Sequence, residues 1–152
     1  MENDMMRILA REGLERELRE LNAVTEDAGL ALSEEDIRAA AERVEQARRD
    51  SGRMEFGRSA VSKLAAAFMD SPHISRENYA ETLMELIDAF YAFRADSDGL
   101  LTDDELPEIM RVYFDEVCFG ESDLLQAATF PEMCRETGFL FRVYGGHSPW
   151  RN

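Results

Sequence analysis

Apolar residues recur along most of this chain at the three- and four-residue spacing of amphipathic helices. One such stripe, in residues 3–22, consists of Met6, Ala10, Leu14, Leu18 and Leu21. The same period predicts five main helices and two short C-terminal ones, at residues 3–22, 33–51, about 58–70, 75–94, 103–117, about 122–128 and 131–136. No convincing run alternates like a strand, so the pattern predicts an all-α fold. We expect a compact multi-helix bundle or an orthogonal helical array.

Local signals mark where several of these helices begin. Ser33 precedes three acidic residues and is typical of a helix N-cap. Ser75 is a second candidate cap, while Pro107 and Pro131 fit only the first turns of their helices. The helix at 75–94 has the widest apolar face and is therefore expected at the centre. Its stripe consists of Tyr79, Leu83, Leu86, Ile87 and Phe90.

The chain length of 152 residues suggests a single domain with a real core. We expect this helical domain to span residues 1–138 and an apolar segment with a flexible tail to span 139–152. The stretch 139–144 could form a short strand, but a lone strand has no partner to pair with. An extended segment packed on the helices is the preferred interpretation.

Charge limits the classes of partner. The net charge is −15, and residues 95–137 carry twelve acidic residues against two basic ones, which gives −10 in that segment alone. This field repels nucleic-acid phosphates and leaves a basic protein as a possible partner. A nucleic-acid mimic, whose carboxylates replace phosphates, is an alternative. No apolar run reaches the roughly 20 residues that span a bilayer, and the two cysteines make no disulfide framework. We expect a cytoplasmic protein without nucleic-acid or membrane partners.

The segment from Phe93 to Leu106 contains the most specific candidate site. With Gly99 at the sharp turn, its acidic and polar residues match the ligand positions of an EF-hand calcium loop at 94–105. The expected calcium ligands are Asp96, Asp98, the carbonyl of Leu100, Thr102 and Glu105. Arg94, however, occupies the first ligand position, where the motif has a carboxylate.

Ordinary helix-end chemistry explains the same residues. Asp96–Gly99 is typical of a turn, in which Gly adopts positive φ after a helix. Thr102 and Glu105 have the spacing of a capping box, in which each side chain bonds the other residue's backbone. Arg94 suits a helix C-terminus electrostatically. This interpretation is preferred to calcium binding.

Candidate catalytic chemistry is sparse. His73 and His147 are the only histidines and thus the candidate general bases, but both lie in expected turns or tails. Cys118, Cys134 and His147 together could bind zinc, although no Cys-x-x-Cys pair is present. The chain has no glycine-rich phosphate loop and no Glu-x-x-His motif. We therefore expect no enzymatic activity, no catalytic residues and no cofactor.

Several short sequence segments resemble those of a bacterial family of small cytoplasmic helical proteins known only as a domain of unknown function. The resemblance covers roughly residues 25–135 and implies no activity. It rests on Arg53-Met-Glu-Phe-Gly57, Ala67-Phe-Met-Asp-Ser-Pro-His-Ile74, Glu77-Asn-Tyr-Ala-Glu-Thr-Leu83 and Leu101-Thr-Asp-Asp-Glu-Leu106.

Two functions from different classes follow from these patterns. The leading hypothesis is a non-enzymatic helical module that binds a protein partner, possibly basic, through its acidic C-terminal half. The alternative is an EF-hand-like module that responds to calcium through the degenerate loop at 94–105.

Overall fold

A computed structural model of the protein describes residues 2–52, 59–97 and 99–138. These residues form seven α-helices and one short 3-10 helix, with no strand among them, and the all-α prediction is confirmed. The helices are α1 (Glu2–Thr25), η1 (Glu26–Ala28), α2 (Glu34–Ser51), α3 (Ala60–Phe68), α4 (Tyr79–Ser97), α5 (Glu105–Glu116), α6 (Ser122–Ala127) and α7 (Phe130–Thr137).

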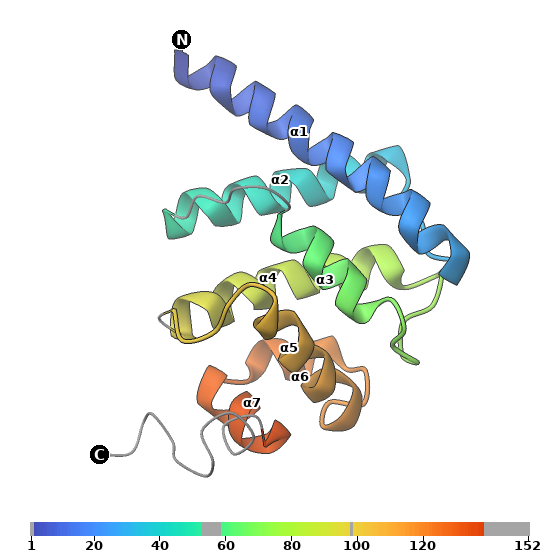
Figure 1. Ribbon diagram of the computed structural model, residues 1–152, viewed down its shortest axis with the longest axis vertical. Coiled ribbons are helices and arrows are strands. Elements are labelled where there is room, and N and C mark those ends of the chain that lie inside the picture. Colours follow the sequence, from blue (N-terminus) through green and yellow to red (C-terminus); the bar gives the residue numbers. More distant parts are fainter. Residues whose placement is uncertain (1, 53–58, 98, 139–152) are drawn as a thin grey trace.

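The helices follow one another along the long axis of the molecule. Figure 1 shows α1 and α2 at one end, α3 and α4 in the middle, and α5, α6 and α7 at the other end. Helix α4 packs against α2, α3, α5, α6 and α7. Its predicted central place is confirmed, and its whole predicted stripe from Tyr79 to Phe90 is buried. The N-terminal part of α1 extends past the other helices (Figure 1).

The buried apolar side chains form one cluster that runs through all seven α-helices. Buried apolar residues of α2, α3 and α5 belong to it. The prediction of a buried stripe on α1 is only partly confirmed. Leu14, Leu18 and Leu21 are buried, but Met6 and Ala10 are exposed. The first turns of α1 extend beyond the helices that would cover them.

The cap predicted at Ser33 is present, whereas Ser75 does not cap α4, which begins only at Tyr79; the Ser75 N–H instead donates to Asn78 Oδ1 at 2.8 Å. Asp36 N–H donates to Ser33 Oγ at 3.0 Å and Ser33 N–H donates to Asp36 Oδ2 at 3.3 Å, so α2 begins with a full capping box. Helix α1 does not end at Asn22, as expected, but continues to Thr25. The Asn22 side chain instead bonds both backbone groups of Leu32, at 2.9 and 2.8 Å, and so fixes the loop before α2.

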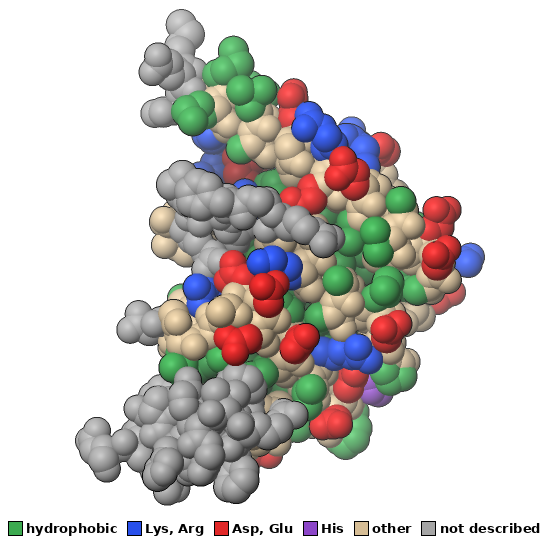
Figure 2. All heavy atoms as spheres, in the orientation of Figure 1, with side chains coloured by type: hydrophobic (Ala, Val, Ile, Leu, Met, Phe, Trp, Pro, Cys, Tyr) green, Lys and Arg blue, Asp and Glu red, His purple; other side chains and the backbone are tan. Residues whose placement is uncertain are grey.

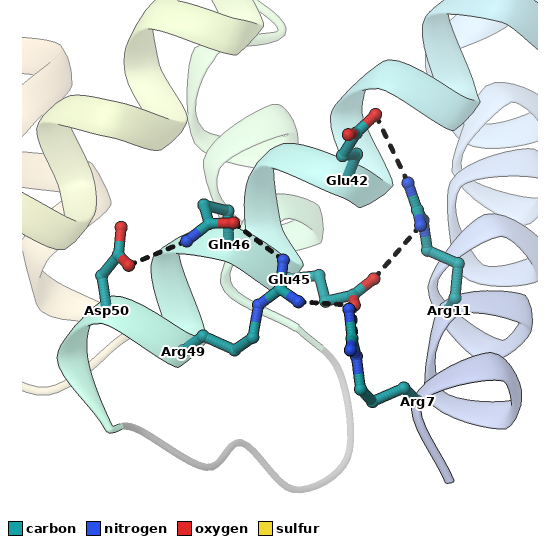
Figure 3. A network of polar contacts seen from close by, with 7 residues as sticks. All are labelled: Arg7, Arg11, Glu42, Glu45, Gln46, Arg49 and Asp50. Carbon is teal, nitrogen blue, oxygen red and sulfur yellow. Dashed lines mark hydrogen bonds and ion pairs between the residues drawn. The ribbon is translucent and has the colours of Figure 1, made fainter. Parts of the chain in front are cut away.

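Several charged side chains of α1 and α2 pair with each other. Figure 3 shows Arg7 and Arg11 of α1 reaching Glu45 of α2, at 3.4 and 3.3 Å. Arg49 approaches the same carboxylate at 3.7 Å, and Arg11 also approaches Glu42 at 3.5 Å. Residues of opposite charge thus neutralise one another at this end of the molecule.

A second polar contact joins α1 to α3. The Glu17 carboxylate accepts hydrogen bonds from the backbone N–H of Ser59, at 3.1 Å, and from the hydroxyl groups of Ser59 and Ser62. Both serines are buried. The Ser59 side chain makes no bond to its own helix, so the carboxylate from α1 caps α3.

Two further expectations concern the C-terminal segment and the absence of a membrane-spanning helix. The segment and tail expected at 139–152 lie outside the described residues. Among the helices that are described, none combines the length and the apolar character that a membrane span requires.

Candidate functional site

The expected calcium loop joins α4 to α5, and Arg94 lies within it. The Arg94 guanidinium donates to the carbonyl of Leu101, and its Nε lies 3.2 Å from the Asp103 carboxylate. A protein cation therefore bonds oxygen atoms of the segment that was expected to surround a calcium ion. Gly99 has φ +79°, as expected for the turn after α4.

Three of the other candidate ligands, Asp96, Thr102 and Glu105, have protein partners. Glu105 Oε1 accepts from the Thr102 N–H at 2.9 Å, and the Glu105 N–H donates to Thr102 Oγ1 at 3.1 Å. Both hydrogen bonds of the predicted capping box are thus present. Asp96 accepts from the N–H of Phe130 at 3.4 Å, at the start of α7, and the Leu100 N–H donates to the carbonyl of Ser97 at 3.0 Å. Asp98 lies outside the described residues.

The geometry therefore describes a helix–turn–helix held by its own side chains. Asp96 and Glu105 face different partners, one at α7 and one at the start of α5. No cluster of three or more acidic, cysteine or histidine side chains suited to a metal occurs in the described ranges. Calcium binding through this loop remains a prediction of the sequence.

Of the candidate zinc ligands and general bases, the described ones pack into the core or against it. Cys118 and Cys134 are buried free thiols, and burial raises their pKa from 9.0 to about 11 and about 12. Both thiols are thus protonated near neutral pH, which makes them poor nucleophiles. His73 lies in a turn with its ring edge-on to Phe114, 6.1 Å between centroids. His147, the third expected zinc ligand, lies outside the described residues.

The structure draws attention to Phe119, a residue that the sequence pattern did not single out. It lies between α5 and α6, and its side chain is 72% exposed. Its φ is +50°, and no other non-glycine residue among those described has positive φ. A left-handed backbone costs an ordinary residue roughly 1–2 kcal/mol. The chain therefore holds a large aromatic side chain in solvent at an energetic cost.

The turn around Phe119 is held from both sides. The N–H of Gly120 donates to the carbonyl of Phe114 at 2.9 Å, and the N–H of Glu121 donates to that of Cys118 at 3.0 Å. The backbone of Gly120 also lies against His73, so closely that a Cβ at position 120 would be 2.6 Å from the His73 ring. This contact holds the turn against the segment that contains His73, and the Phe119 side chain faces solvent.

Acidic residues lie on both sides of Phe119 in the sequence. Glu116, Glu121 and Asp123 are all exposed, and in the described part of the chain none of the three forms an ion pair. Leu124, on α6, adds a second exposed apolar side chain. Figure 2 shows acidic and hydrophobic side chains side by side over the lower part of the molecule, where α5 and α6 lie in Figure 1.

Nearby Asp115 differs from these three acids because it has partners. Ser71 donates to Asp115 Oδ1 at 2.6 Å, and Arg111 Nε lies 3.1 Å from Oδ2. Arg111, one of only two basic residues in the acidic segment, is thereby committed to an internal contact.

We define the acidic apex as Glu116, Phe119, Glu121, Asp123 and Leu124.

One sequence signal could have identified the apex. Phe119 follows the helix predicted at residues 103–117. It is followed by Gly and has acidic residues on both sides in the sequence. An aromatic residue at such a position has no helical neighbour to pack on, which suggests exposure. Periodicity alone missed it because the residue belongs to no helix.

Comparison with known proteins places the chain without assigning an activity. The model of one protein family, described as a family of unknown function (DUF6323), matches residues 17–141. That range includes the acidic apex and the loop at 94–105. No curated protein and no solved structure matches the chain.

Proposed function

The chain belongs to DUF6323, a family of unknown function, and we propose that it acts as a non-enzymatic helical module that binds a basic protein through the acidic apex. The observation that carries this proposal is Phe119, an aromatic side chain that is exposed on a strained backbone. Strain of this kind concentrates at functional positions, where the surrounding structure enforces it.

The chemistry of the apex supports a protein partner. Aromatic residues dominate the energetic centres of protein interfaces, and Leu124 enlarges the apolar contact that Phe119 can offer. The carboxylates of Glu116, Glu121 and Asp123, which form no ion pair within the described ranges, lie on both sides of Phe119 in the sequence. Such a rim attracts a basic surface over long range and repels an acidic one. An apolar pocket bordered by Lys or Arg is the complementary surface.

The proposal excludes nucleophilic chemistry at the two cysteines. Their raised pKa values leave very little thiolate at neutral pH. The single described histidine, His73, packs its ring on Phe114 and lies against Gly120. These contacts give it a role in holding the turn that displays Phe119.

A pair of substitutions separates the strain at Phe119 from its side-chain contacts. We expect Phe119→Gly to be more stable than Phe119→Ala by about 1 kcal/mol, because both remove the ring and only Gly relieves the left-handed backbone. Urea denaturation of both variants measures the difference. Equal stabilities, or a more stable Ala variant, would show that the backbone at 119 is not strained and would remove the main support for the proposal.

The same two variants test binding. Full-length wild-type protein, fixed on a resin, should retain a basic protein from a lysate of the source organism, and both Phe119 variants should lose it. Capture should weaken as salt is raised, because charge contributes to the contact. Val24→Ser is the matched control, since Val24 is also an exposed apolar residue but lies on α1. Identical retention by wild type and both Phe119 variants contradicts the proposal.

A further inference from the structure

The first turns of α1 carry an apolar surface that the described helices leave uncovered. Met5, Met6, Ile8 and Leu9 are each between 54% and 70% exposed. They make up four of the seven exposed large hydrophobic side chains in the described residues. We call these four residues the α1 patch. Large exposed apolar patches mark interaction sites on folded proteins.

The α1 patch lies on the opposite side of the helix from the core. At roughly 100° per residue, its four members fall within an arc of about 160°. The centre of that arc is about half a turn away from the one defined by Leu14, Leu18 and Leu21, which face the core. The helices that pack on the core therefore leave the patch free for a partner.

The charge around the patch favours a second copy of this chain. Residues 2–16 contain four acidic residues and three arginines, a net charge of −1, whereas the whole chain carries −15. Two copies repel each other least where their charge is lowest. The acidic helices α5, α6 and α7 lie at the other end of the long axis (Figure 1), so a contact through α1 also keeps them far apart.

The surface beside the patch is hollowed, as a self-complementary contact requires. A hollow of about 430 Å³ between α1 and α2 is lined by Arg7, Ile8, Arg11, Glu12 and Glu45. Its two arginines are already paired with Glu45 and Glu42, so covering their alkyl stems leaves neither guanidinium without a carboxylate (Figure 3). An unbranched side chain such as Met5 of a second copy suits a hollow of this irregular kind.

We propose that the α1 patch is the contact surface of a two-fold symmetric homodimer in which two α1 helices lie antiparallel. In such an arrangement Leu9 lies near the two-fold axis, and each hollow receives a side chain of the other copy. The antiparallel direction places the first turn of each helix near Arg16 of the other. It also pairs opposite ends of the two helix dipoles. This dimer is independent of the binding proposed for the acidic apex.

Sedimentation of the full-length protein tests this directly. Between about 1 µM and about 1 mM, the average mass of the wild type should rise from 17.3 kDa towards twice that value. Leu9→Glu should remain at the monomer mass over the same range, because it places two carboxylates together at the two-fold axis. Val24→Glu, an equal change at an exposed apolar position elsewhere on α1, should associate like the wild type.

Salt distinguishes this contact from the one at the apex. Raising sodium chloride from about 50 to about 500 mM should strengthen the dimer, since it screens the repulsion between two chains of charge −15. Binding of a basic partner should weaken under the same change. A dimer that dissociates on adding salt would contradict the proposed burial of a nearly neutral apolar surface.

Crosslinking checks the symmetry. Leu9→Cys should form a disulfide-linked dimer on mild oxidation, whereas Val24→Cys should not, and the two natural thiols are buried and so do not compete. A wild type that stays monomeric at about 1 mM overturns the proposal. So does a Leu9→Glu variant that dimerises normally. Wild type that stays monomeric but co-sediments with phosphatidylcholine–phosphatidylglycerol vesicles, in a way that Leu9→Glu abolishes, would replace the second copy with a lipid surface.

Discussion

Replacing Gly120 by Ala should lower the free energy of unfolding by about 2–4 kcal/mol. Gly120 has φ +81°, where any L-residue is strained by roughly 1–2 kcal/mol. In addition, the new Cβ would lie 2.6 Å from Cβ and Cγ of His73. His73 Cβ is attached directly to the backbone, and the ring packs on Phe114, so neither atom can move aside without displacing a turn. Urea denaturation measures the loss.

Gly29→Ala is the matched control for this prediction. Gly29 has φ +79°, almost the same backbone, but no atom lies within 4 Å of the position its Cβ would take. It should therefore lose only the backbone part, about 1 kcal/mol. The excess at Gly120 should shrink in a His73→Gly background, which removes the clashing atoms. Equal losses at Gly29 and Gly120 would show that the contact with His73 does not hold the turn.

Replacing Glu17 by Ala should also cost about 2–4 kcal/mol, because one carboxylate satisfies several buried donors. The backbone N–H of Ser59 and the hydroxyl groups of Ser59 and Ser62 all donate to it, and both serines are about 1% exposed. Without Glu17 these groups lose their acceptor in a region closed to water. The first turn of α3 then also loses the negative charge that stabilises it.

Two further variants show whether the effect comes from hydrogen bonding. Glu17→Gln keeps one acceptor oxygen of the same reach and should lose less than half as much as the Ala variant. Glu20→Ala removes an exposed carboxylate from the same helix and should change stability by less than about 0.5 kcal/mol. If Glu20→Ala were as damaging as Glu17→Ala, the cost would arise from α1 itself rather than from its contact with α3.

The sequence was sufficient for features that depend on residues within one helical turn of each other. The N-cap at Ser33 and the capping box of Thr102 with Glu105 are present as predicted, since each needs only residues three positions apart. Helical periodicity likewise predicted seven helices and the buried stripe of α4. Burial follows reliably there because α4 has neighbours on many sides.

The candidate site was less predictable. The calcium interpretation depended on residue types in a loop, but the structure gives Arg94, Asp96 and Glu105 separate protein partners. The Asp96 partner, Phe130, is 34 positions away. Phe119 was missed because its exposure results from contacts of the turn that holds it, including the one between Gly120 and His73.

The amino-acid sequence alone thus determined the helices, the caps at Ser33 and Thr102, most of the core and the uneven distribution of charge. These properties depend on residue type and on spacing within a few positions. Only the tertiary structure decided that Met6 faces solvent rather than the core, that Glu17 caps α3, and that Phe119 stands outside at an acidic end. Each of these depends on how far one helix extends past another or on contacts between distant segments, and the pattern along a single helix carries no information about either.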